Sequence, residues 1–182
     1  MNPQIFRESD GYKSEDFLQS AYHHFEAARL LMSSSTSPDL FDSGGYLLHL
    51  SIELIFKSWL LHENKQFEIK NGKGHSLQGL RDKVCELQPT LKFSSRHNRI
   101  IEYFQNHFEL RYPNRQKPTE IGSQDLDLAQ ELINKITENL PDDLYSKFEA
   151  IPFGTKGGRV YMEKPENSDN DFDLITNRQA RI

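Results

Sequence analysis

The sequence has little cysteine, a low apolar content and no long apolar run. Cys85 is the single cysteine among 182 residues, which excludes an intrachain disulfide and a metal cluster built on several thiolates. Apolar residues make up 36 % and mean hydropathy is −0.72; typical globular chains reach about 45–50 %, a figure that includes glycine. No segment approaches the roughly 18 apolar residues of a membrane span. Residues 1–10 lack the apolar core of a secretory signal, so we expect a cytoplasmic protein.

The aromatic content and the charge distribution are more informative. Phe, Tyr and Trp together reach 11 %, so large rings can still build a core. The net charge of −5 divides into −5 for residues 1–64, +6 for residues 65–117 and −6 for residues 118–182. A basic centre in an acidic chain indicates an anionic ligand. The same charge distribution is expected if basic helices pack beside acidic ones and their charges cancel. Both interpretations, an anionic ligand and local cancellation, remain open.

Apolar residues recur at helical spacing in several segments. They predict helices over about residues 14–32, 42–62, 75–87, 95–110 and 123–140. The second segment is apolar on nearly every side, which is typical of a central helix. We therefore predict an all-α fold: an up-and-down antiparallel bundle of about five helices within residues 1–140, with residues 1–13 as an arm and residues 63–74 as a loop.

The pattern changes after Pro141. Residues 147–153 and 159–163 flank a glycine-rich turn and predict a β-hairpin. The remainder of the segment is polar and acidic. Residues 141–182 are therefore expected to be a C-terminal extension, either a hairpin or partly disordered.

Three polar residues form a stripe on the otherwise apolar second helix. His49, Glu53 and Lys57 follow one another at intervals of four. Charged groups on such a helix need partners or a wet cavity. Two interpretations remain: Glu53 anchors a neighbouring helix by hydrogen bonds, or the stripe faces a solvated groove. His49 and Glu53 supply no third metal ligand, so we expect neither metal nor cofactor.

The basic centre contains two further candidate elements. His75 follows Gly72-Lys73-Gly74 at a helix start, where backbone N–H groups attract anions. On the fourth helix, residues recur at intervals of four: Arg99, Tyr103, His107 and Arg111. Arginine can bind a phosphate, an aromatic ring can stack on a base, and histidine can move a proton near neutral pH. The alternative is a solvated helix face with an ordinary histidine.

Several of these residues resemble the motifs of HEPN domains, the nucleotide-binding domains of higher eukaryotes and prokaryotes. The resemblance covers about residues 14–140, and residues 43–61 match the second helix of that family. It is carried by Ala27-Ala28-Arg29-Leu30-Leu31, by Glu53 with Lys57 four residues later, by His75-Ser76-Leu77 and by Arg111-Tyr112-Pro113.

The resemblance implies a helical bundle, often a homodimer, in prokaryotic toxin–antitoxin, phage-defence or RNA-processing systems. Some such domains bind nucleotides and some pair with a minimal nucleotidyltransferase. Many are metal-independent endoribonucleases. Their motif is an arginine that is followed, after four to six residues, by a histidine. Both side chains act at the scissile phosphate, which the ribose 2′-hydroxyl attacks. Here Arg99 and His107 are separated by seven residues, and eight helical steps span about 12 Å.

Three functions follow from the sequence. The first is binding of a nucleotide or RNA by a HEPN-like domain, through Glu53, Lys57, His75, Arg111 and Tyr112. The second is a metal-independent endoribonuclease in which His107 is the base and Arg99 or Arg111 holds the phosphate. The third is a protein-interaction module, with a nucleotidyltransferase-type antitoxin as its partner.

Overall fold

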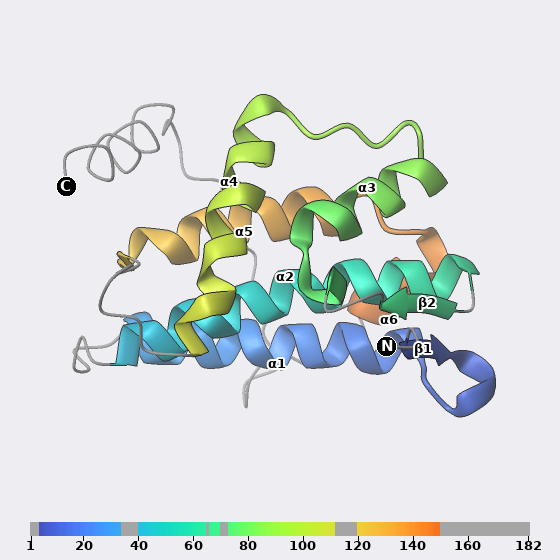
Figure 1. Ribbon diagram of the computed structural model, residues 1–182, viewed down its shortest axis with the longest axis horizontal. Coiled ribbons are helices and arrows are strands. Elements are labelled where there is room, and N and C mark those ends of the chain that lie inside the picture. The colour runs from blue at the N-terminus through green and yellow to red at the C-terminus, as the bar shows by residue number, and fades with distance from the viewer. Residues whose placement is uncertain (1–3, 34–39, 65, 70–72, 112–119, 150–182) are drawn as a thin grey trace.

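The computed structural model describes residues 4–33, 40–64, 66–69, 73–111 and 120–149 (Figure 1). The elements in chain order are β1 (Gln4–Arg7), η1 (Glu8–Asp10), α1 (Ser14–Ser33), α2 (Phe41–Asn64), β2 (Gln66–Ile69), η3 (Lys73–His75), α3 (Leu77–Leu87), α4 (Ser95–Asn106), η4 (His107–Arg111), α5 (Gln124–Thr137) and α6 (Asp142–Glu149), where η marks a 3₁₀ helix. The predicted all-α bundle is confirmed. No helix among these residues is both long and apolar enough to cross a membrane.

The helix α2 lies at the centre of the bundle, as its all-round apolar character predicts. It packs against α1 as an antiparallel pair and also contacts α3, α4, η4 and α5 (Figure 1). Trp59, Phe56 and Leu48 of α2 are almost completely buried. In Figure 1, α5 runs alongside the α1–α2 pair, whereas α4 crosses it steeply. Polar groups on α2 therefore have little access to water and need partners within the protein.

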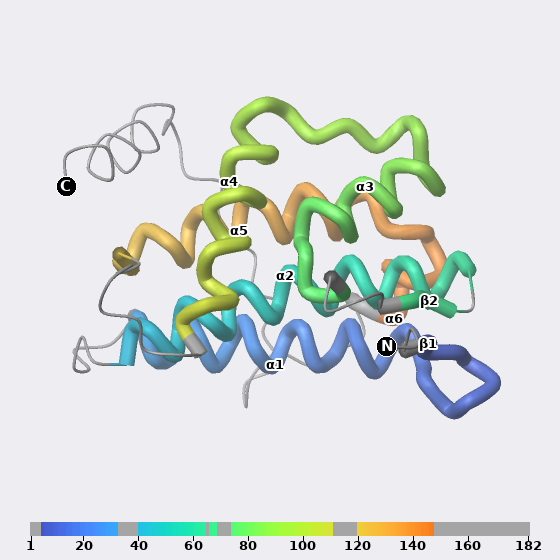
Figure 2. Tube along the Cα trace, in the orientation of Figure 1, coloured from blue at the N-terminus to red at the C-terminus, as the bar shows by residue number. Residues whose placement is uncertain are grey.

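The steep α4 begins with a reciprocal cap. Ser94 Oγ accepts a hydrogen bond from the His97 backbone N–H at 3.2 Å, and His97 Nδ1 accepts one from the Ser94 N–H at 3.4 Å. This arrangement satisfies two N–H groups that a helix start otherwise leaves unpaired. At its C-terminal end α4 continues as the 3₁₀ helix η4, which contacts α2 (Figure 2). The predicted fourth helix is thus α4 followed by one 3₁₀ segment.

A small sheet replaces part of the predicted arm and loop. Strands β1 and β2 pair antiparallel, with Phe6 opposite Phe67 and their rings stacked at 4.8 Å between centroids. Tyr12 and Phe17 pack against this pair through ring edges. Residues 4–7 of the predicted arm thus form a strand that pairs with residues 66–69 of the predicted loop. Strands of four residues are too short to show an alternating pattern, and their pairing joins distant parts of the chain.

The segment after Pro141 begins with a helix. Residues 147–149, predicted as the start of a strand, belong to α6. His62 Nε2 lies 3.0 Å from Asp143 Oδ1, and Lys147 Nζ lies 3.3 Å from Glu15 Oε2, so α6 is tied to the end of α2 and the start of α1. The rest of the predicted hairpin, residues 150–163, lies outside the described residues.

Candidate functional site

Glu53 is the centre of a buried polar cluster, which we call the Glu53 cluster: His49, Glu53, Lys57 and His75. Its carboxylate is 1 % exposed and accepts a hydrogen bond from Lys57 Nζ. His49 Nε2 lies 3.2 Å from Oε2, and His75 Nδ1 lies 3.0 Å from both carboxylate oxygens. Three residues come from α2 and one from η3. The structure therefore unites the sequence-predicted residues Glu53, Lys57 and His75.

The Glu53 carboxyl group is ionised under ordinary conditions. Burial raises its pKa, but the hydrogen bond from His49 and the charges of Lys57 and His75 outweigh burial and lower the pKa to about 2. An ionised carboxylate only accepts hydrogen bonds. The ring nitrogens that face Glu53, Nε2 of His49 and Nδ1 of His75, must therefore both carry hydrogen.

His49 links the Glu53 carboxylate to α4. Its second nitrogen, Nδ1, lies 2.8 Å from the backbone oxygen of Phe104. Lys57 is the direct ionic partner of Glu53 within the cluster, and the two histidines extend the hydrogen-bond network on either side of this pair.

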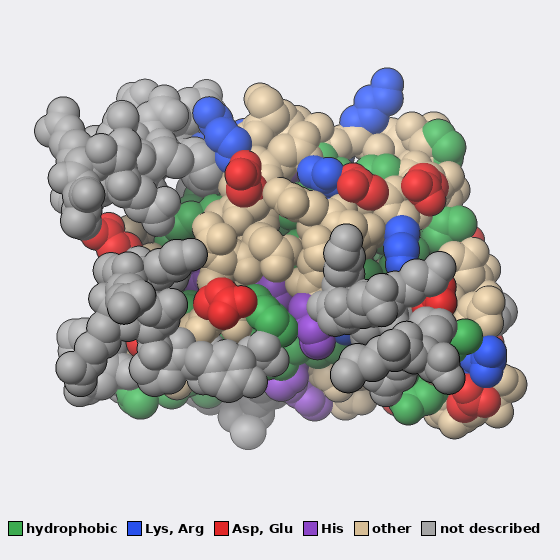
Figure 3. All heavy atoms as spheres, in the orientation of Figure 1, with side chains coloured by type: hydrophobic (Ala, Val, Ile, Leu, Met, Phe, Trp, Pro, Cys, Tyr) green, Lys and Arg blue, Asp and Glu red, His purple; other side chains and the backbone are tan. Residues whose placement is uncertain are grey.

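His75 is the open edge of this cluster. Its side chain is 38 % exposed, whereas that of His49 is fully buried. Figure 3 shows histidine side chains at the surface near the middle of this face. The imidazole stacks on Phe108 with centroids 4.7 Å apart and ring planes 27° apart. Since Nδ1 donates to Glu53, Nε2 is the nitrogen with which His75 would meet a ligand.

Gln105 fixes the backbone beside His75. Its side-chain oxygen accepts a hydrogen bond from Leu77 N–H at 2.7 Å, and its amide nitrogen donates to the His75 carbonyl at 3.4 Å. The stack on Phe108 and this pair of hydrogen bonds both link η3 to the α4–η4 segment. The position of His75 therefore depends on contacts with α2, α4 and η4. No spacing within one helix could have predicted the role of Gln105.

The two remaining predicted binding residues lie at the border of the described chain. Arg111 is the last residue of η4, three positions after Phe108. The side chain of Arg111 is not among those that the structure describes. Tyr112 lies outside the described residues.

His107, the predicted catalytic base, is completely buried in a different network. Its Nδ1 lies 3.2 Å from the Tyr103 carbonyl oxygen, and its Nε2 lies 3.5 Å from Asp125 Oδ2. The Tyr103 hydroxyl donates to Asp125 Oδ1 at 2.9 Å, and Gly122 N–H donates to Oδ2 at 3.3 Å. Burial, followed by the Asp125 charge, raises the pKa of Tyr103. Arg99 is exposed on α4, so the structure does not bring it to a common surface with His107.

Gly45 explains how His107 comes so close to α2. A Cβ atom at this position would lie 2.9 Å from Cδ2 of His107, 2.8 Å from Cδ1 of Leu110 and 2.7 Å from Cδ1 of Ile121. Real Cβ atoms essentially never make contacts below 3.0 Å. Because Gly45 has no side chain, η4 and His107 can pack directly against α2.

Two arginines of α3 and α4 are paired with acidic or amide groups. Arg96 makes a two-pronged ion pair with Glu131 of α5, at 2.8 and 2.9 Å, and Arg81 contacts Asp82 and Asn98. On the face in Figure 3, basic side chains lie beside acidic ones. For these arginines the local cancellation of charge, one of the two interpretations from the sequence, is correct.

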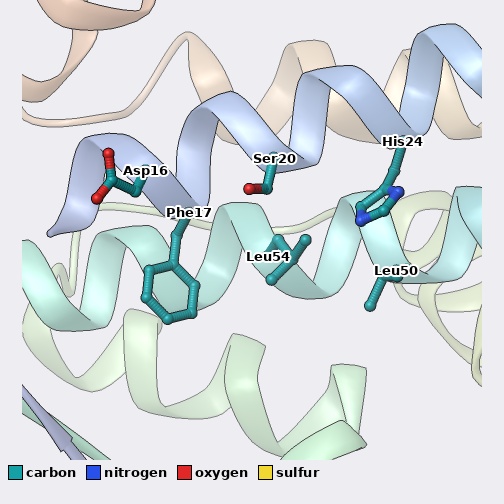
Figure 4. A pocket seen from close by; sticks show the side chains of 6 residues that line it. All are labelled: Asp16, Phe17, Ser20, His24, Leu50 and Leu54. Carbon is teal, nitrogen blue, oxygen red and sulfur yellow. The ribbon is translucent and has the colours of Figure 1, made fainter. Parts of the chain in front are cut away.

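A shallow groove of about 340 Å³ between α1 and α2 is a separate surface feature (Figure 4). It is lined by Asp16, Phe17, Ser20, His24, Leu50 and Leu54. Burial, and secondarily the neighbouring His23, lowers the pKa of His24. The groove is mostly apolar and does not contain a sequence-predicted site residue.

Stability is expected to fall as the pH drops from about 4.5 toward 2. The folded-state pKa of Glu53, about 2, lies below its ordinary value of 4.5. Its stabilising contribution is therefore complete above pH 4.5 and is lost as the pH falls through 2. Urea denaturation of wild type and Glu53→Gln across this range should give a stability difference that shrinks on acidification. A difference that does not change with pH would contradict the ionised Glu53.

Among the described residues, no group of three or more His, Cys, Asp or Glu side chains is arranged to hold a metal ion.

Comparison of the chain with protein-family models, with curated proteins and with solved structures finds no match. The resemblance to HEPN domains therefore stays a prediction from the sequence, and the Glu53 cluster is the candidate site that the structure itself supplies.

Proposed function

We propose that this chain is a HEPN-like domain that binds a nucleotide or RNA at the exposed edge of the Glu53 cluster. The setting that we propose is prokaryotic defence, a toxin–antitoxin pair or RNA processing. One observation carries the proposal: a single buried carboxylate faces three nitrogen-bearing side chains, and the only one of the three with substantial exposure is His75. The endoribonuclease and the nucleotidyltransferase-paired module stay predictions.

The exposed edge of the cluster supports a phosphate ligand. Nδ1 of His75 is held by the Glu53 carboxylate, and the side chain of His75 is 38 % exposed. A phosphate oxygen at Nε2 would form a hydrogen bond that the negative charge of the phosphate strengthens.

The aromatic stack supports the same ligand class. His75 and Phe108 form a stacked pair of flat rings, and bases of single-stranded nucleic acids stack on aromatic side chains.

Ligand binding should raise the thermal midpoint of the wild-type protein. A ligand at 100 times its dissociation constant stabilises the native state by about 2.7 kcal/mol. We expect AMP, ATP or a short single-stranded RNA to produce this shift in a thermal-melt assay and to bind in calorimetry. His75→Gln should lose at least tenfold in affinity.

His23→Gln is the matched control, because His23 is an exposed histidine on α1, away from the Glu53 cluster. It should bind like the wild type. If neither nucleotides nor RNA shift the midpoint or produce heat of binding, the proposed function is wrong.

A further inference from the structure

We infer that Gln105 is a positioning residue of the ligand site. Its side chain holds the backbone of residues 75–77, and thereby holds the His75 ring in the place where the ligand binds, without touching the ligand. The inference rests on the proposed function and adds to it the residue on which binding at His75 depends.

The Gln105 side chain makes two hydrogen bonds with one short stretch of backbone. Its oxygen accepts from the Leu77 N–H at 2.7 Å, and its nitrogen donates to the His75 carbonyl at 3.4 Å. One planar amide can make both bonds because it carries a donor and an acceptor. The two backbone groups lie on either side of Ser76, which is extended at φ −79° and ψ 107°. The amide therefore fixes both the place and the orientation of this stretch.

The first N–H groups of α3 are engaged within the protein. The start of a helix leaves several N–H groups without intrahelical partners, and such groups attract anions. Here the Leu77 N–H donates to Gln105, and the Gly79 N–H donates to Ser76 Oγ at 3.2 Å. A phosphate at this helix start would have to compete with both bonds, so we place the ligand contact at the exposed ring of His75.

The His75 ring needs a fixed backbone to keep its own contacts. Its Nδ1 lies 3.0 Å from both oxygens of Glu53, and its ring stacks on Phe108 with centroids 4.7 Å apart. Both contacts hold only while residue 75 stays at one place between α2 and η4. Gln105 supplies that hold from α4, three residues before Phe108, so the backbone and the ring of His75 are attached to the same segment.

A ring that is held before binding has less freedom to lose when the ligand arrives, and this raises affinity. Gln105→Met removes both hydrogen bonds, keeps an unbranched side chain and adds no charge near the phosphate. We expect this variant to bind about tenfold more weakly, because an aligned hydrogen bond to a charged group contributes at least that much.

Calorimetry on the full chain tests the inference with AMP, ATP and a short single-stranded RNA, and the tightest of the three is then used for the variants. Asn106→Met is the matched control, since Asn106 is the exposed neighbour of Gln105 on α4; it should bind like the wild type. In the His75→Gln background, Gln105→Met should cause no further loss, because the two residues act through one ring.

The hold on His75 has a readout that needs no ligand. The NMR cross-relaxation between the ring protons of His75 and Phe108 should be weaker in Gln105→Met than in the wild type and in Asn106→Met. Circular dichroism confirms that each variant is folded. If Gln105→Met does not fold, hydrogen exchange of the wild type replaces it: the ligand should slow exchange of the Leu77 N–H, and an unchanged rate overturns the inference.

The outcomes separate this inference from the proposed function. Wild-type affinity in Gln105→Met, an unchanged contact between the two rings, or an equal loss of affinity in the His75→Gln background overturns the positioning role and leaves the proposed function intact. If none of the three probes binds the wild type, the proposed function itself is overturned, and the positioning role with it.

Discussion

Glu53→Ala should lower the free energy of unfolding by about 3–5 kcal/mol, the usual cost of removing one partner from a buried ion pair. The variant leaves Lys57 without its buried carboxylate partner, and His49 and His75 without their shared hydrogen-bond acceptor. The loss should be measured by urea denaturation near neutral pH, where the carboxylate is ionised in the wild type.

Glu26→Ala is the matched control for this variant. Glu26 also pairs with a cation on its own helix, Arg29 at 2.7 Å, but at the partly exposed surface of α1. Surface pairs contribute about 0–1 kcal/mol. If Glu53→Ala is destabilised no more than Glu26→Ala, the Glu53 cluster is solvated, and Glu53 is not the buried partner of its neighbours.

The second large effect is expected at Asp125. Replacing it with alanine should cost about 3 kcal/mol, because its carboxylate is fully buried and accepts hydrogen bonds from Tyr103 and Gly122 beside His107. His107→Ala should be destabilising too. The double variant should lose less than the sum of the two single variants, since both residues belong to one network.

Asp127→Ala provides the control on the same helix, because Asp127 is exposed. As an acidic residue in the first turn of α5, it should contribute no more than about 1 kcal/mol.

A cleavage assay separates two roles for His107. If the wild type cleaves RNA in the presence of a chelator, and a fully folded His107→Gln variant does not, the catalytic prediction from the sequence is supported over a purely structural role.

Periodicity predicted the part of the site that lies on one helix. Intervals of four placed His49, Glu53 and Lys57 on one face of α2, and the apolar surroundings indicated that the stripe needed partners. Spacing could not predict that His75, beyond the next strand, would meet Glu53. The place of His75 at a helix start and the resemblance to HEPN domains made it a candidate, and the structure shows its contact with Glu53.

Periodicity was misleading on the fourth helix. Arg99, Tyr103 and His107 recur at intervals of four, yet Arg99 is exposed whereas Tyr103 and His107 are buried. The 3.6-residue turn makes such a stripe drift around the helix, and the change to a 3₁₀ segment at His107 turns it further. Which side of the stripe becomes buried depends on α2 and α5, whose positions no local pattern contains.

The close contacts at Gly45 of α2 are made by the side chains of His107, Leu110 and Ile121, and no pattern within α2 identifies these partners. Asp125, which holds His107, carried no signal in the sequence beyond being one of several acidic residues at the start of a helix.

The contact between Gly45 and His107 has a consequence for how this sequence can diverge. The two positions are separated widely along the chain but share one volume, so they are expected to change together. A relative with alanine or serine at position 45 should carry smaller side chains at one or more of positions 107, 110 and 121. Asp125 would keep its hydrogen bonds from Tyr103 and Gly122, so it should stay even where His107 is replaced.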